Sequence, residues 1–340
     1  WGDLDNDGDI DLAIAGLDAA DNYLFSTYYR EDNQNTFIKE INWGYQGFIN
    51  GDMKIIDIDL DGDNDIVYSG ENSSGSPIGG HIMNTLMNPD SNFYLSVPAL
   101  KNSTIEITRI NNTSQNRLSF IASGEDSSGN TVLYADPILA GADGAGTEEQ
   151  YPKLKKGDIS VADYNIDGLN DMIFTGENQV GEPVTQLYIQ DSNGNFSEAI
   201  LDLQGLRNST ATWVDYDMDG DLDLFLTGED NTGVKTILYN SEIANKKNTP
   251  PTKITGLEFE DLGYGKVRLS WDKPADDFSN DLSYMLRLGT TPGGTELSNT
   301  ESDLLTGKRL ISKPGQIHTN FFEMQLDPGN YYWSVQAVDN

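Results

Sequence analysis

The sequence predicts an all-β protein: a β-propeller built from five repeats of about 53 residues, followed by a β-sandwich. Three observations support this. A glycine recurs after an apolar run at Gly16, Gly70, Gly124, Gly176 and Gly228, with spacings of 54, 54, 52 and 52 residues. Short alternating apolar runs lie between Gly, Asn and Asp turns, and no segment sustains a helical period of 3.6. After residue 251 the repeat does not resume, but the alternation continues.

Each repeat predicts one four-stranded sheet. The segments that precede the recurring glycines are "DLDNDGDIDLAIAG", "DIDLDGDNDIVYSG", "NNTSQNRLSFIASG", "DYNIDGLNDMIFTG" and "DYDMDGDLDLFLTG". In the fourth repeat, the pattern predicts strands over residues 159–164, 172–175, 184–189 and 196–203. A tandem array of separate small domains is the alternative, but a lone unit of this size without cysteine would bury only a small core, which favours blades that pack on one another. A β-helix would need a much shorter period.

Four of these segments carry a metal-binding pattern. In Asp215-x-Asp217-x-Asp219-Gly220-Asp221-x-Asp223, side-chain oxygens at positions 1, 3, 5 and 9 can converge. The carbonyl of position 7 can add another ligand, and the glycine at position 6 permits a sharp turn. Two carboxylates about 5 Å apart repel by roughly 3 kcal/mol at an effective dielectric of 20. The loop is therefore costly when empty, and a cation with many oxygen ligands, Ca²⁺, would stabilise it.

We expect four Ca²⁺ sites, one in each acidic loop. The predicted ligands are Asp3, Asp5, Asp7, Asp9 and Asp11; Asp57, Asp59, Asp61, Asp63 and Asp65; Asp163, Asn165, Asp167, Leu169 and Asp171; and Asp215, Asp217, Asp219, Asp221 and Asp223. Leu169 stands at position 7, where only its carbonyl is needed. The third repeat should be metal-free, because it offers Asn111, Thr113, Gln115 and Ser119, with Asn116 at the glycine position. A helix-loop-helix site is disfavoured, because position 12 is Ile14, Tyr68, Phe174 or Leu226 instead of glutamate.

These repeats resemble the FG-GAP or VCBS-type calcium-binding repeats of integrin-α-like β-propellers. The resemblance covers residues 1–244 and rests on the D-x-D-x-D-G-x-x-D loop, the period and the "TGED"-type turn that follows. It implies that the loop joins the first two strands of a blade and that calcium has a structural role. It also implies partner binding by loops on the opposite face.

The remaining chain predicts a linker at 245–251 and a second domain at 252–340. Apolar residues alternate at Val267, Leu269 and Trp271, at Tyr284, Leu286 and Leu288, and at Tyr331, Trp333, Val335 and Ala337. The segment "LDPGNYYWSVQAVDN" resembles the tyrosine-corner region of a fibronectin type III domain, in which the last strand is missing here. The combination resembles modules of large secreted proteins from Bacteroidetes-type bacteria.

Composition limits the partners. The 21 basic and 55 acidic residues give a formal charge of -34, which argues against nucleic acid and anionic membranes. No apolar run is long enough to span a membrane, so no membrane insertion is expected. Because cytosolic calcium is too low to fill such sites, we expect a secreted or cell-surface protein, monomeric, that binds an extracellular protein or glycan.

The function predicted is a calcium-stabilised, non-catalytic extracellular adhesion or ligand-binding module. The alternative is a non-catalytic part or propeller scaffold of a secreted polysaccharide-degrading enzyme, a lyase or glycosidase; a structural spacer is a third possibility. Catalysis is disfavoured because the chain has only two histidines, His81 and His318, far apart in the sequence, and most clustered aspartates are presumptive ligands.

Two further patterns repeat. Glu71, Glu125, Glu177 and Glu229 follow the recurring glycines, which indicates either an acidic docking site or, more simply, solvated turn residues. Tyr134, Tyr188 and Tyr239 occupy equivalent positions, which favours packing between blades over sugar stacking. We also expect a fifth sheet of three strands and an incomplete first repeat, both completed by residues upstream of Trp1.

Overall fold

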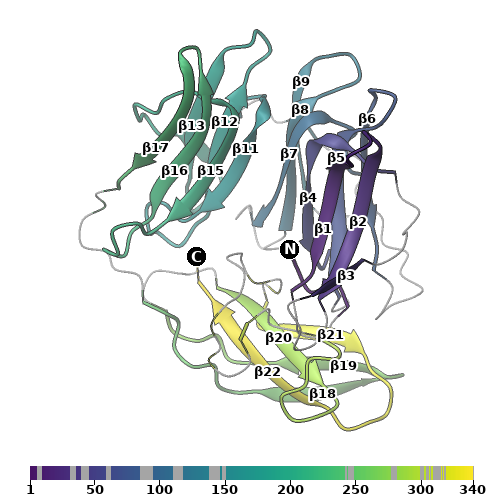
Figure 1. Ribbon diagram of the computed structural model, residues 1–340. Helices are drawn as coiled ribbons and strands as arrows, with labels where there is room; N and C mark the ends of the chain where they lie inside the picture. Colours follow the sequence, from purple (N-terminus) through teal and green to yellow (C-terminus); the bar gives the residue numbers. More distant parts are fainter. Residues whose placement is uncertain are drawn as a thin grey trace.

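The computed structural model is all-β, with 22 strands in the residues that it describes. These residues are 1–5, 10–30, 36–39, 46–58, 63–84, 95–109, 118–137, 146–147, 151–241, 243, 249–276, 282–298, 302–303, 306, 308, 315, 317 and 319–339. Figure 1 shows the sheets of the repeat region following one another in chain order, with the strands β18 to β22 below them.

Each repeat forms one small antiparallel sheet in which neighbours along the chain pair. The first sheet contains β1 (Leu12–Leu17), β2 (Tyr23–Arg30) and β3 (Phe37–Lys39), and the second β4 (Ile49–Ile56), β5 (Asp65–Glu71) and β6 (Pro77–Ile82). The third contains β7 (Lys101–Arg109), β8 (Leu118–Glu125), β9 (Thr131–Pro137) and β10 (Gly146–Thr147). The fourth contains β11 (Lys155–Ala162), β12 (Asp171–Glu177), β13 (Pro183–Gln190) and β14 (Phe196–Glu198). The fifth contains β15 (Arg207–Val214), β16 (Asp223–Asp230) and β17 (Gly233–Tyr239).

The strands predicted for the fourth repeat are present, and one is shorter than expected. The strand expected over 196–203 ends at Glu198. The amide of Ala199 still donates to the Leu187 carbonyl at 2.8 Å, but the amide of Leu201 then donates back to the Ala199 carbonyl at 3.0 Å. This local turn takes the chain out of the ladder. The fifth sheet has three strands among the described residues, in agreement with the expectation for its strand count.

The first strand of the second to fifth sheets carries a bulge at the same place. The register shifts there, and the bulged residue has a positive φ of 45° to 54° in Asn50, Asn102, Lys156 and Asn208. The bulge brings the strand close to the recurring glycine of its neighbour. A Cβ added at Gly124 would lie 2.8 Å from the Cβ of Ser103, which explains the glycine physically.

Consecutive sheets are joined by hydrogen bonds from side chains of one repeat to the backbone of the next. The acceptor side chains occupy equivalent positions in the first strands of successive repeats. Each accepts a backbone amide from the first strand of the next repeat, one residue after the position equivalent to its own. Asp52 Oδ2 accepts from Ile105 N (3.0 Å), Thr104 Oγ1 from Ile159 N (3.4 Å) and Asp158 Oδ2 from Ala211 N (3.0 Å). A bulged strand thus leaves amides that its neighbouring sheet satisfies.

The hydrophobic cores lie between the sheets. The two faces of β12 show this, because Met172 and Phe174 pack with Ile121 and Leu133 of the third sheet. Ile173, which points the other way, packs in the next cluster, together with strands β13, β15 and β16. Tyr134, Tyr188 and Tyr239 all pack in such clusters, as the packing interpretation predicts. The sheets are therefore consistent with blades, and the propeller stays a prediction.

The region after residue 251 forms two further sheets around one core. One has the order β18 (Glu258–Gly263), β19 (Lys266–Ser270) and β21 (Phe321–Gln325); the other pairs β20 (Ser283–Gly289) with β22 (Tyr332–Val338). Both contribute to the same hydrophobic cluster. Trp271 lies just outside β19 and Tyr331 just before β22, although both were expected within strands.

The tyrosine-corner resemblance implies a backbone hydrogen bond, and the structure has it. The Tyr331 hydroxyl donates to the Asp327 carbonyl at 2.7 Å. The β-sandwich, its fibronectin type III assignment and the boundaries 1–244, 245–251 and 252–340 stay predictions.

Candidate metal centres

The acidic segments lie where the sequence predicts, between the first two strands of a sheet. Residues 57–65 join β4 to β5, residues 163–171 join β11 to β12, and residues 215–223 join β15 to β16. Residues 3–11 lead into β1, and Gly2 pairs with Asp11 as an isolated bridge. Asp7, Asp9, Asp59 and Asp61 lie outside the described residues, as do residues 110–117 of the loop expected to be metal-free. The loops 163–171 and 215–223 are described completely.

Among the described residues of the four acidic loops, the aspartate at position 9 is the most deeply buried, and the backbone holds it on both sides. Asp11, Asp65, Asp171 and Asp223 are each 0 % exposed. In each, Oδ2 accepts the amide of position 2, and Oδ1 accepts an amide at or just after the end of β2, β6, β13 or β17. The donors are Leu4 (2.7 Å) and Arg30 (2.9 Å), Ile58 (3.0 Å) and Asn84 (2.8 Å), Tyr164 (3.1 Å) and Gln190 (2.9 Å), and Tyr216 (2.8 Å) and Ser241 (2.8 Å). Position 9 therefore ties the loop to the sheet.

The aspartate at position 1 shapes the turn itself. Asp163 accepts the amide of Asp167 at 3.0 Å and that of Gly168 at 2.7 Å. Asp215 accepts the equivalent amides, from Asp219 at 3.1 Å and Gly220 at 3.2 Å. These bonds fold positions 5 and 6 back toward position 1 in both loops.

The sharp turn uses left-handed backbone at two positions. Gly168 and Gly220 have φ of 86° and 98°, which confirms the role predicted for the glycine at position 6. Position 4 also has a positive φ, 54° at Ile166 and 62° at Met218, which the sequence did not predict. A β-branched residue strongly disfavours this conformation, so the loop 163–171 is the more strained of the two.

Side-chain oxygens of positions 1, 3 and 9 converge in two loops. Those of Asp215, Asp217 and Asp223 lie within 4.8 Å of one another. The same holds for Asp3, Asp5 and Asp11 in the first loop. The predicted ligand positions 1, 3 and 9 are thus brought together there, although position 9 is at the same time engaged by backbone amides. A carboxylate oxygen can accept more than one interaction, so both roles are compatible.

The loop 163–171 departs from this arrangement where its sequence departs from the pattern. The side-chain Nδ2 of Asn165 donates to Asp167 Oδ2 at 2.9 Å, so the side chain at position 3 contacts the one at position 5. The amide of Leu169 donates to Asp167 Oδ1 at 2.9 Å, as the amide of Asp221 does to Asp219 Oδ1 at 3.1 Å. Position 5 therefore orders position 7 in both loops.

No lysine or arginine forms an ion pair with residues 163–171 or 215–223 in the described part of the chain. Burial raises the pKa of Asp171 to about 7, and the neighbouring Asp163 and Asp167 raise it further against the effect of its hydrogen bonds. Burial also raises the pKa of Asp163 and Asp221. These sites destabilise their own negative charge, as the sequence predicts for loops that need a cation.

The donor set fits a calcium ion. All donors offered are hard oxygens, in a loop that supplies side-chain and carbonyl groups. The Oδ1 atom of Asp221 is buried without a hydrogen-bond partner, while its Oδ2 accepts the amide of Ile243 at 3.0 Å. A buried carboxylate oxygen without a donor is an unusual cost that a cation would remove. Asp221 was predicted to contribute its carbonyl alone, and the structure adds its side chain to the candidates.

The other residues singled out by the sequence do not assemble a second site. His81 lies on β6, where burial lowers its pKa, and His318 lies outside the described residues. Glu125 forms ion pairs with Lys101 at 3.2 Å and Lys155 at 2.6 Å, and Glu177 pairs with Lys156 at 3.1 Å. These glutamates therefore join neighbouring strands or sheets instead of standing free in solvent.

Sequence reasoning missed the double role of position 9. No signal in the sequence set position 9 apart, because positions 1 and 5 are also aspartate in all four acidic loops. The third repeat, which has Ser119 at position 9, also lacks the other acids.

One family model matches the chain. It describes an FG-GAP-like repeat and aligns with residues 163–226, which span both fully described loops. No curated protein matches the sequence. FG-GAP-like repeats are typical of calcium-binding extracellular β-propeller modules. No described helix is long and apolar enough to cross a membrane.

Proposed function

We propose that this protein is a non-catalytic extracellular adhesion or ligand-binding module whose repeats form a β-propeller held rigid by four calcium ions. One observation carries the proposal. Four loops at equivalent places share a fully buried aspartate tied to two backbone segments, and in two of them three carboxylates converge. The FG-GAP-like match over two consecutive loops supports it.

Calcium has a structural role in this proposal. When bound, it supplies the positive charge that the loops lack. Asp215 and Asp217 would hold it at the fifth loop together with Asp223, with Asp221 close by. Because Asp223 also binds the amides of Tyr216 and Ser241, cation binding would fix the loop, the second strand and the end of the third strand as one unit.

A secreted or cell-surface location fits this chemistry. Extracellular calcium modules have dissociation constants of roughly 10⁻⁴ to 10⁻³ M, so extracellular fluids fill them and cytosol does not. The formal charge of -34 adds a long-range attraction for cations. The ligand is an extracellular protein or glycan, bound by a monomer whose propeller is followed by a fibronectin type III-like sandwich.

A binding screen tests the proposal. The 340-residue protein is presented to arrays of glycans and extracellular matrix proteins in millimolar calcium and in EDTA. We expect a ligand that binds in calcium and is lost in EDTA. A variant Asp217→Asn, which weakens one site, should need more calcium for the same binding. Binding that EDTA leaves unchanged, or turnover of a polysaccharide, would contradict the proposal and favour a spacer or an enzyme scaffold respectively.

A further inference from the structure

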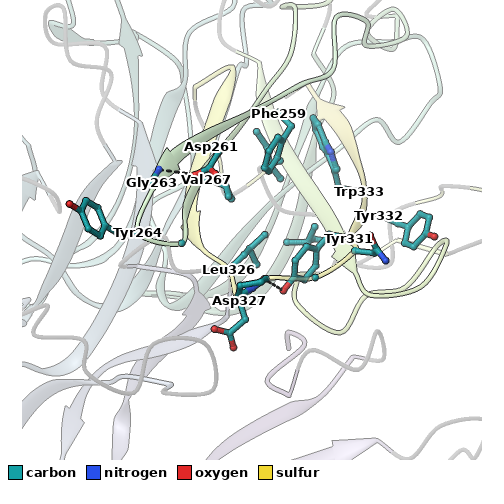
Figure 2. Close-up of a pocket in the computed structure, with 16 residues that line it drawn as sticks. Phe259, Asp261, Gly263, Tyr264, Val267, Leu326, Asp327, Tyr331, Tyr332 and Trp333 are labelled. Carbon is teal, nitrogen blue, oxygen red and sulfur yellow. Dashed lines mark hydrogen bonds between the residues drawn. The ribbon is translucent and has the colours of Figure 1, made fainter.

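A cavity of about 670 Å³ lies between β18 and β22 in the C-terminal region (Figure 2). Phe259, Tyr264 and Trp333 are among the residues that line it. The resemblance to a fibronectin type III domain predicts one more strand beside β22, so this cavity belongs to the packing of that domain. The repeat region, in contrast, contains a buried contact between two acidic loops that the repeat pattern does not require.

Two buried asparagine side chains join the first acidic loop, residues 3–11, to the second repeat. Asn64, at position 8 of the second loop (residues 57–65), donates from Nδ2 to the Asp3 carbonyl at 2.8 Å. Asn84, which follows β6, donates from Nδ2 to the Leu4 carbonyl at 2.7 Å. Both asparagines are buried. Positions 1 and 2 of the first loop are thus held by side chains of the neighbouring repeat.

Asn84 is also bound to the second loop itself. Its backbone amide donates to Asp65 Oδ1 at 2.8 Å, and its Nδ2 also donates to the Asn64 carbonyl at 3.2 Å. In the first loop, the Leu4 amide donates to Asp11 Oδ2 at 2.7 Å. A continuous series of hydrogen bonds therefore runs from Asp11 through Leu4 and Asn84 to Asp65. Both of its ends are position-9 aspartates, which the sequence predicts as calcium ligands.

The side chain of Leu4 strengthens this connection. It is buried and packs with Ile55, Ile66 and Ile82 of the second sheet. Leu4 is therefore fixed to the second repeat by its side chain as well as by its carbonyl. Because breaking buried hydrogen bonds leaves polar groups without a partner, we expect the two loops to be ordered together.

The fifth repeat lacks both donors. Its residue at position 8 is Leu222, whose side chain has no hydrogen to donate. The residue whose amide binds Asp223 Oδ1 is Ser241, and its buried hydroxyl has no hydrogen-bond partner. The fourth repeat keeps the first donor, but Asn170 reaches Thr108 of β7 at 3.3 Å, in the repeat that has no acidic loop. The connection between two acidic loops is thus a particular feature of the first pair.

Electrostatics and hydrogen bonding predict opposite effects of one filled loop on the other. Each of the first two loops has five aspartates and stays net negative when one Ca²⁺ is bound. Filling one loop lowers the negative charge next to the other, so charge alone would weaken binding of the second ion. Salt at 0.15 M screens this effect beyond about 8 Å. The sign of the coupling therefore distinguishes the two causes.

We propose that the first two loops bind calcium with positive coupling and that Asn84 is the positioning residue that links them. This inference rests on the proposed function. When the second loop is filled, Asp65 is fixed, Asn84 holds the Leu4 carbonyl, and the Leu4 amide holds Asp11. The first loop is then already ordered and binds calcium more tightly. By linkage, the effect has the same size in either direction. The fourth and fifth loops bind independently of each other.

Hydrogen–deuterium exchange tests the coupling, because mass spectrometry of peptides reads each loop separately. The 340-residue protein is titrated with calcium in 0.15 M KCl. Asp5→Ala removes position 3 of the first loop and should raise the calcium concentration that half-protects the second loop at least about fivefold. The matched control, Asp217→Ala, removes position 3 of the fifth loop. It should change the calcium concentration that half-protects the fourth loop less than about twofold.

A second variant tests Asn84 itself. Asn84→Ser introduces the residue that the fifth repeat has at the equivalent place, Ser241. In this background, Asp5→Ala should change the calcium concentration that half-protects the second loop less than about twofold. If Asn84 had only a structural role, the shift would stay at least about fivefold, and the assignment of the link to Asn84 would be wrong.

Three outcomes of the first comparison overturn the coupling. These are an unchanged midpoint of the second loop in Asp5→Ala, a lower midpoint, and an equal shift of the fourth loop in the control. In all three, calcium still protects the loops, so the proposed function stands. Absence of calcium-dependent protection in every loop contradicts the proposed function and this inference with it. Because the first comparison leaves Asn84 intact, it does not depend on how Asn84→Ser folds.

Discussion

The protein concentrates carboxylates in two kinds of place, and only one of them includes a cation of its own. On the first strands of the second to fourth sheets, Asp52, Glu106 and Asp158 surround Lys54. The Lys54 ammonium lies 3.4 Å from Glu106 and 3.8 Å from Asp52. Burial lowers the pKa of Lys54, but the three carboxylates outweigh burial, and the pKa is raised. In the two fully described acidic loops, no lysine or arginine plays this part.

This difference separates the contributions to stability that should depend on calcium from those that should not. The charge of the Lys54 cluster, which consists of Lys54, Asp52, Glu106 and Asp158, is balanced within the chain. The cluster should therefore hold the sheets together with or without calcium. In our proposal, the charge of the acidic loops is balanced by an external cation. The aspartate at position 9 of the loops should stabilise the fold both with and without calcium, since backbone amides already donate to both of its oxygens.

The largest loss of stability should come from replacing the aspartate at position 9. Asp223→Ala removes a fully buried carboxylate and leaves two amides without acceptors. Hydrogen bonds to charged groups contribute about 1.5 to 3 kcal/mol each, so we expect a loss of about 4 kcal/mol in the free energy of unfolding. Urea denaturation in EDTA measures it without any contribution from calcium.

The control for this change is Asp217→Ala, at an exposed position of the same loop. Its unfolding free energy in EDTA should stay within about 0.5 kcal/mol of the parent. If the two variants are equally stable in EDTA, position 9 is a ligand only and has no role in tying the loop to the sheet.

Replacing Lys54 should cause the next largest loss of stability. Lys54→Met leaves three carboxylates facing one another between the sheets, and we expect a loss of about 2 kcal/mol at pH 8, since the site is only partly shielded from solvent. Burial raises the pKa of Glu106 and of Asp158, so these groups take up protons more readily in the folded state.

The pH dependence of this loss follows from the raised pKa values. An acid whose pKa is higher in the folded state favours folding at low pH, and this contribution is lost as the pH rises. The cost of Lys54→Met should therefore be smaller at pH 4.5 than at pH 8. Thermal unfolding at both pH values, in EDTA, would show this, and a cost that is larger at pH 4.5 would contradict the assignment.

The smallest expected effect is a change in calcium affinity, and its direction should differ between the two fully described loops. Asp217→Asn removes one charge from the loop 215–223, and Asn165→Asp adds one to the loop 163–171. Calcium affinity follows the number of charged ligands. We expect roughly tenfold weaker calcium binding at the changed site for the first variant and stronger binding for the second. The calcium concentration that gives half of the thermal stabilisation measures both, and shifts in the same direction would contradict the comparison.

Much of the fold could be predicted because the repeat is local. The recurring glycine and the acidic pattern indicated the order of strands and the sharp turn at Gly168 and Gly220. The family resemblance implied that each loop lies between the first two strands. The Tyr331 hydroxyl bonds within the tyrosine-corner region that its motif resembles. These features depend on residues close together in the chain.

The parts that could not be predicted depend on contacts between distant segments. The second bond of Asp171 comes from Gln190, nineteen residues away, and requires the third strand to end beside the loop. The Lys54 cluster requires the relative register of the first strands in neighbouring sheets, which hydrophobic alternation does not determine. The early end of β14 at Glu198 was missed, because "FSEAILDL" alternates well beyond the point where its partner strand ceases to pair with it.

The most direct test of the central claim is the number of calcium ions bound per chain. Equilibrium dialysis of the 340-residue protein against calcium at about ten times the expected dissociation constant provides it. Our account predicts four ions per chain and a melting temperature that rises as they bind, with about 2.7 kcal/mol gained per site at hundredfold excess. A protein that binds no calcium under these conditions would contradict the account.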